Sequence, residues 1–119
     1  MRALSKKTVG TMLAIIMMLM GTLSVHAATY TGEYGSGTYT ATLQFTSSYT
    51  VVALSYSPES PSDTQYTSVD GYIEYVSGGR RSVAISGLGG CYQKFTGKYD
   101  GGSCNYHIGS TTVKTISIL

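Results

Sequence analysis

Residues 28–119 contain a single histidine, His107, three residues after Cys104. Nucleophilic catalysis needs such a base next to a nucleophile and oriented by a third group, and the sequence singles out no Ser or Asp as its partner. A metal site of the Cys/His type would need more ligands than these two residues supply. We therefore expect His107 to lie on a strand face without a catalytic role.

Six acidic residues are the remaining candidates for acid–base chemistry. Glycoside hydrolysis needs two carboxylates about 5–10 Å apart across a cleft, and calcium loops need oxygen ligands at fixed spacings. These acids are spread over expected loops and polar strand faces, and they match neither arrangement. We predict no enzyme activity, no metal and no cofactor. The acids are Glu33, Glu59, Asp63, Asp70, Glu74 and Asp100.

Tyrosine is in clear excess, with 11 residues in the chain. Exposed tyrosine among Ser, Thr and Gly is typical of adaptable binding surfaces and of sugar-stacking platforms, although small β proteins also use tyrosine for strand propensity alone. Six tyrosines are expected in the core: Tyr30, Tyr34, Tyr39, Tyr56, Tyr75 and Tyr106. The expected ligand-binding residues are Tyr49, Tyr66, Tyr72, Arg80, Arg81, Tyr92, Lys98 and Tyr99.

The stretch 38–46, Thr-Tyr-Thr-Ala-Thr-Leu-Gln-Phe-Thr, alternates apolar and polar residues with period two. This pattern predicts a half-buried strand. A turn at Gly35-Ser36 would pair Gly32 with Tyr39, and a turn at Ser47-Ser48 would pair Leu43 with Val52, so 30–56 should form a three-stranded meander. We expect Leu43→Asp to unfold the domain and Thr42→Lys to be nearly silent.

The second half of the chain contains further strands. An exposed loop, 57–64, should carry the chain to a second sheet. A three-residue loop at 78–80 would pair Ile73 with Ile85 and place Arg80 and Arg81 at an exposed hairpin tip. A Gly109-Ser110 turn would pair Tyr106 with Val113, which leaves Ile116 and Ile118 on the opposite face.

Two cysteines, Cys91 and Cys104, predict one disulfide in an exported chain. A hairpin centred on Gly97-Lys98 would place them directly opposite each other, whereas a turn at 100–102 would offset them. Closing a loop of this size should stabilise the fold by about 3 kcal/mol.

Residues 1–27 have the features of a cleaved signal peptide: Arg2, Lys6 and Lys7, an apolar run at 11–23, and Val25-His26-Ala27 before the expected cleavage site. The apolar run is shorter than the roughly 20 residues that span a bilayer. Residues 28–119 then have a formal charge near −1, with five basic and six acidic residues. We therefore expect a secreted, extracellular protein that binds no nucleic acid and has no transmembrane segment in its mature chain.

The expected architecture of 28–119 is a single all-β domain: a small antiparallel β-sandwich of about seven to eight strands, meander or Greek-key-like, with one disulfide. This arrangement is similar to small exported bacterial sandwiches, including some β-type bacteriocins. The main expectation is a non-enzymatic binding or surface-interaction protein, with a protein or glycan partner, that acts at the cell envelope or extracellularly. The alternative is a secreted bacteriocin-like or toxin-like antagonistic protein.

Overall fold

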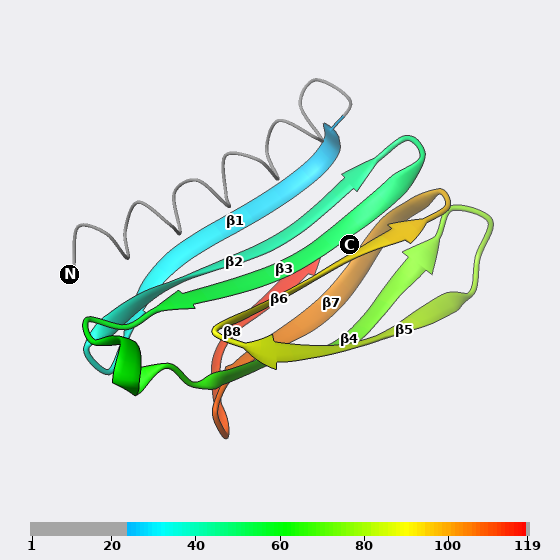
Figure 1. Cartoon of the computed structure of the whole chain (residues 1–119). Coiled ribbons are helices and arrows are strands. Elements are labelled where there is room, and N and C mark those ends of the chain that lie inside the picture. The colour runs from blue at the N-terminus through cyan, green and yellow to red at the C-terminus, as the bar shows by residue number, and fades with distance from the viewer. Residues whose placement is uncertain (1–23, 119) are drawn as a thin grey trace.

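The computed structural model describes residues 24–118, which form eight strands and one short 3-10 helix. The strands make two four-stranded antiparallel sheets, in the order β1-β2-β3-β6 (sheet A) and β5-β4-β7-β8 (sheet B), stacked on a shared core (Figure 1). The elements are β1 (Ser24–Tyr34), β2 (Gly37–Thr46), β3 (Tyr49–Ser57), η2 (Pro61–Asp63), β4 (Tyr66–Tyr75), β5 (Arg80–Leu88), β6 (Gly90–Thr96), β7 (Tyr99–Ile108) and β8 (Thr111–Ile118). The predicted all-β sandwich is confirmed.

Most of the predicted signal peptide, residues 1–23, lies outside the described residues. Its last residues, from Ser24 to Ala27, pair with the end of β2 at the start of β1. Between residues 24 and 118 no helix is long and apolar enough to cross a membrane.

The predicted meander of β1, β2 and β3 is confirmed in every register. Gly32 pairs with Tyr39, and Leu43 pairs with Val52. Gly35 has a φ of 57°, which suits the first position of the predicted hairpin turn. Tyr39 covers the bare backbone at Gly32, because a Cβ there would lie 2.7 Å from two carbons of the Tyr39 ring. The alternation therefore sets both the faces and the pairing of these strands.

The chain changes sheets at three connections. The loop from β3 to β4, which contains η2, joins sheet A to sheet B as predicted. The connection around Gly89 (φ 75°) returns the chain from β5 to β6 in sheet A. The turn at Gly97-Lys98 then leads from β6 to β7 in sheet B, with Gly97 at a φ of 134°.

This last crossing contradicts the predicted disulfide. Because β6 and β7 belong to different sheets, they do not form a hairpin: Cys91 pairs with Leu54 in sheet A, and Cys104 pairs with Gly71 and Ile116 in sheet B. Both cysteines are free thiols. Burial raises the pKa of the Cys91 thiol and raises that of Cys104 to about 12, so both stay protonated.

The predicted register of the β4–β5 hairpin is also wrong. Ile73 pairs with Arg81 and Val69 pairs with Ile85, four positions away from the expected pairing. The loop lies two positions earlier in the chain than expected, since Tyr75 N–H donates to the Gly79 carbonyl (3.0 Å) and residues 76–78 form the turn. Because the offset is even, the inward and outward faces are the ones predicted.

A β-bulge between Tyr106 and His107 changes the phase of β8. Ile108 pairs with Thr111 as the Gly109-Ser110 turn predicts, but Tyr106 pairs with Lys114 instead of Val113. The extra residue lets Val113, Ile116 and Ile118 all pack against the core. The prediction that Ile116 and Ile118 lie on the face opposite Val113 is therefore wrong.

Tyrosines tie the two sheets together. The Tyr106 hydroxyl, fully buried, donates to the Thr42 carbonyl (2.7 Å), and the Tyr39 hydroxyl donates to the Val113 carbonyl (3.1 Å). Two expectations about tyrosine burial are wrong: Tyr30 is 45% exposed, whereas Tyr99, expected at the surface, is only 3% exposed.

The polar side of β2 faces away from this core and is nevertheless buried. Thr42 is 1% exposed and Gln44 3%, and Val51 and Ala53 of β3 form a second small apolar cluster on the same face. Leu43, on the core side, is completely buried. A lysine at position 42 would place a charge at a buried site, so the expectation that Thr42→Lys is silent is not supported.

Candidate functional site

Three turns meet at one end of the sandwich: β2–β3 (Ser47-Ser48), β4–β5 (76–79) and β6–β7 (Gly97-Lys98). Backbone hydrogen bonds connect them, since Gly97 N–H donates to the Ser48 carbonyl and Val76 N–H donates to the Lys98 carbonyl, both at 2.9 Å. The Thr46 hydroxyl oxygen supports the first turn by accepting from the N–H of Tyr49 (3.0 Å). Loops from both sheets are therefore held in one arrangement.

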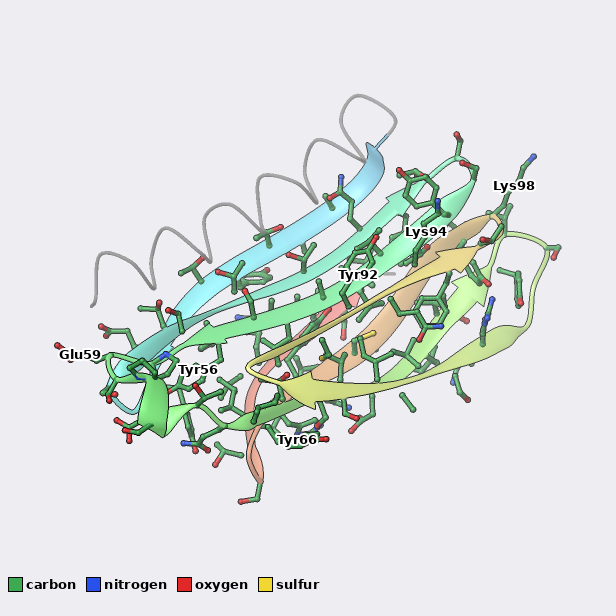
Figure 2. The ribbon with its side chains drawn as sticks, in the orientation of Figure 1. Tyr56, Glu59, Tyr66, Tyr92, Lys94 and Lys98 are labelled. Carbon is green, nitrogen blue, oxygen red and sulfur yellow. The ribbon has the colours of Figure 1, made fainter. Side chains whose placement is uncertain are left out.

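Four of the five basic residues between 24 and 118 lie at this end, which we call the basic end: Arg80, Arg81, Lys94 and Lys98. Glu74 and Asp100 are the acidic residues near them, and the Arg80 Nε lies 3.5 Å from the Glu74 Oε2. Lys98 is exposed at the tip of its turn, and its ammonium group has no partner among the described residues. Figure 2 shows Lys94 and Lys98 at this end.

Three of these cations lie over aromatic rings. The Arg80 guanidinium is 3.9 Å from the centroid of Tyr72, and the Lys94 ammonium is 4.5 Å from that of Tyr49. The Arg81 guanidinium is 5.0 Å from the centroid of Phe95. Such pairs contribute about 0.5–1 kcal/mol each at exposed sites. They restrict long side chains that would otherwise be free, and so they hold the positive charge in place.

Arg81 is turned into the end of the sandwich and is not at an exposed tip as predicted. Its Nη1 donates to the Tyr99 hydroxyl (3.1 Å), and that hydroxyl donates to the Thr96 carbonyl (3.2 Å). The rings of Tyr75 and Tyr99 are 4.6 Å apart. The hydrogen bond with Tyr99 raises the pKa of both Arg81 and Tyr75, so the guanidinium stays charged and the phenol neutral.

The eight predicted binding residues are only partly brought together. Tyr49, Tyr72, Arg80 and Lys98 lie at the surface of the basic end, with Arg81 and Tyr99 beneath them. Tyr92 lies further along β6, on the outer face of sheet A, and Tyr66 is at the opposite end of the molecule (Figure 2). The sequence analysis missed Lys94 and Phe95. The alternation of Tyr92, Lys94 and Thr96 along one strand could have shown that Lys94 shares a face with Tyr92.

His107 has partners that the sequence did not reveal. Its Nε2 lies 2.8 Å from the Asp70 Oδ2, and its Nδ1 lies 2.9 Å from the Thr112 hydroxyl. The other Asp70 oxygen accepts from Asn105 Nδ2 (3.1 Å). The order hydroxyl, imidazole, carboxylate is that of a catalytic triad, but the residues lie on the open outer face of sheet B, where water reaches the Asp70 carboxylate (57% exposed). The arrangement serves to join β4, β7 and β8.

No group of three or more His, Cys, Asp or Glu side chains within 24–118 is placed to hold a metal ion. Comparisons with protein-family models, with curated proteins and with solved structures find no match to this chain.

Proposed function

We propose that the chain is a small exported, non-enzymatic binding or surface-interaction protein, and that it contacts its partner at the basic end. The observation that carries this proposal is the clustering of four cations at the end of the sandwich where three hydrogen-bonded turns meet, with three of the cations over aromatic rings. A rigid, charged end formed by loops on a β scaffold is a common arrangement for recognition. The site of action is the cell envelope or the extracellular space.

The partner that fits this end carries negative charge. The face of Tyr72 is covered by Arg80 and that of Tyr49 by Lys94, so these rings support the cations and are not open for stacking on a sugar. Lys98 adds an exposed ammonium group with no acidic partner in the described chain. An acidic glycan, which offers repeated carboxylates along a flexible chain, fits this surface better than a neutral one.

Catalysis is not part of the proposal. The Thr112–His107–Asp70 arrangement is the nearest to a catalytic group in the described residues, and its Asp70 carboxylate is exposed to water. Binding alone therefore accounts for the features of the basic end.

The test is binding of the purified protein to polygalacturonate, with a neutral glucan as comparison, at 50 and 300 mM NaCl. We expect the protein to bind polygalacturonate and not the neutral glucan, and to bind more weakly at the higher salt concentration. Arg80→Ala combined with Lys98→Ala should weaken this binding about tenfold, which corresponds to about 1.4 kcal/mol. Lys114→Ala is the matched control, because Lys114 also lies over a ring, that of Tyr30 at 4.0 Å, but outside the basic end. Equal binding of the neutral glucan, or an equal loss in the control, would refute the proposal.

The same protein should be added to growing bacterial cultures, because a secreted antagonist remains the second candidate. Growth inhibition that persists in the Arg80→Ala, Lys98→Ala variant would favour that candidate over the binding protein.

A further inference from the structure

A cavity opens at the end of the sandwich opposite the basic end. It is an open hollow between the β1–β2 turn, the end of β3 and η2, with a volume of about 430 Å³. Figure 2 shows Tyr56 and Glu59 in this part of the molecule. We call it the loop cavity, and its lining residues are Gly35, Ser36, Tyr56, Ser62, Asp63, Thr64 and Gln65.

The walls of the loop cavity are fixed by internal hydrogen bonds. The Tyr56 hydroxyl donates to the Tyr34 carbonyl (3.0 Å), and the rings of these residues meet edge to face at 5.8 Å. On the other side, the Thr64 hydroxyl donates to the Pro61 carbonyl (2.8 Å), and Asp63 N–H donates to the Ser60 carbonyl (2.9 Å). The cavity is therefore formed before a ligand enters it.

The charge at this end is negative. Asp63 lines the cavity, and Glu33 and Glu59 are exposed nearby, whereas none of the five basic residues between 24 and 118 is found there. The nine residues of β3 run from one end to the other, about 26 Å at about 3.3 Å per residue. This exceeds the Debye length of about 8 Å at physiological salt, so the basic end of a molecule does not neutralise its own loop cavity.

We propose that the loop cavity receives the basic end of a second copy of this chain, with Lys98 of one molecule against Asp63 of the next. The chain itself supplies the complementary partner: a projecting turn, held by the bonds of Gly97 and Val76, that carries the exposed Lys98 ammonium group, which has no partner between residues 24 and 118. Since each molecule has one basic end and one cavity, the contact is head-to-tail and does not close on itself as a twofold dimer does. Molecules should join into short linear chains.

This inference goes beyond the proposed function but uses the same Lys98, so an acidic glycan should compete with self-association. Contacts through exposed charges are weak and salt-sensitive. We therefore expect association at high protein concentration and 50 mM NaCl, and monomers at 500 mM.

The test is sedimentation velocity of the purified protein over a concentration series. Asp63→Lys and Lys98→Glu should each lower the apparent association constant at least tenfold at 50 mM NaCl. An equimolar mixture of the two variants should associate again, because the intact basic end of one fits the intact cavity of the other and the two reversed sites also carry opposite charges. Lys114→Glu, a charge reversal away from both ends, should associate like the unmodified protein.

Three results would overturn the inference: monomers throughout the low-salt series, association unaffected by either reversal, or a mixture of the two variants that does not associate. Circular dichroism of each variant checks that the fold is retained. Polygalacturonate binding of the unmodified protein is measured on the same samples. If the unmodified protein binds the glycan but does not self-associate, the head-to-tail contact alone is overturned; if it self-associates but does not bind the glycan, the proposed function alone is overturned.

Discussion

Replacement of Tyr106 by Phe tests the packing of the two sheets. The Tyr106 ring, in sheet B, is fully buried, and its hydroxyl reaches across the core to the Thr42 carbonyl of sheet A at 2.7 Å. Phenylalanine keeps the ring and removes only this hydrogen bond. The substitution therefore isolates one polar contact between the sheets.

Tyr106→Phe should lower the free energy of unfolding by about 1 kcal/mol at pH 7. A net intramolecular hydrogen bond contributes about 0.5–1.5 kcal/mol, and an orphaned buried carbonyl would cost more. Thr42 is also paired with Thr29 and Ala53 inside sheet A, so its carbonyl is not isolated in the variant. For a domain of this size, 1 kcal/mol lowers the melting temperature by about 4–8 °C.

The pH dependence gives a second, independent readout of Tyr106→Phe. Burial, followed by the nearby Cys104 and Cys91 thiols, raises the pKa of Tyr106 above its ordinary value. As the pH rises, the phenol therefore ionises first in the unfolded chain, near pH 10. The contribution of Tyr106 to the free energy of unfolding is complete below that pH and falls above it by about 1.4 kcal/mol per pH unit. Phenylalanine has no such proton, so the free energies of unfolding of the original protein and of Tyr106→Phe should become equal near pH 11.

Urea unfolding at pH 7, 10 and 11 measures both effects. Tyr66→Phe serves as the control, because Tyr66 is 62% exposed and a change there should stay within about 0.5 kcal/mol. The reasoning would be refuted by a Tyr106→Phe protein as stable as the original at pH 7, or by two stability curves that fall in parallel above pH 10.

Two further predictions concern the cysteines. Without reductant, the unfolded protein should react with two equivalents of a thiol reagent, because Cys91 and Cys104 are both free; the absence of reactive thiol would show that a disulfide forms after all. Because the unfolded thiol ionises near pH 9 and the buried Cys104 only near 12, stability should fall as pH rises through this window. Between pH 8 and 10 the fall should be about 1.4 kcal/mol larger than in Cys104→Ala, as urea unfolding would measure, and equal slopes would contradict the burial of this thiol.

The part of the fold that the sequence predicts correctly is the part built from local turns. In β1, β2 and β3, two-residue turns at Gly35 and Ser47 leave one register that pairs apolar with apolar residues, as Leu43 and Val52 do. Adjacent hairpin strands give such a pattern because neighbours in sequence are neighbours in the sheet.

The sequence fails where the chain changes sheets or strand phase. Gly97-Lys98 looks like a hairpin turn, but the strands on either side pair with β3 and β4, which are distant in sequence. Alternation specifies which face of a strand is inside and leaves open which sheet the strand joins. The disulfide prediction failed for this reason, and the exposed position expected for Tyr99 failed with it. The only sign of the bulge before His107 in the sequence is that the spacing of apolar residues in β8 changes between Val113 and Ile116.

The candidate site could likewise be predicted from the sequence only in part. Sequence composition identified the Arg80-Arg81 and Lys98-Tyr99 segments as candidates, and the structure places them at one end. The composition could not show that Arg81 points inward to Tyr99, nor that Arg80 covers the ring of Tyr72. Such contacts depend on the approach of loops from two sheets, which only the three-dimensional fold determines.

The tyrosines, taken together, indicate why charge and not stacking should dominate recognition. Four have buried rings and donate their hydroxyls to backbone carbonyls, and so they hold the sandwich together: Tyr39, Tyr56, Tyr99 and Tyr106. Three more lie under a cation: Tyr30, Tyr49 and Tyr72. Tyr34 and Tyr75 pack beside other tyrosines. The two rings left uncovered, Tyr66 and Tyr92, lie in different sheets and cannot form one stacking platform. Under the proposed function, a partner would meet ring-supported cations, and its affinity should follow salt concentration more closely than sugar identity.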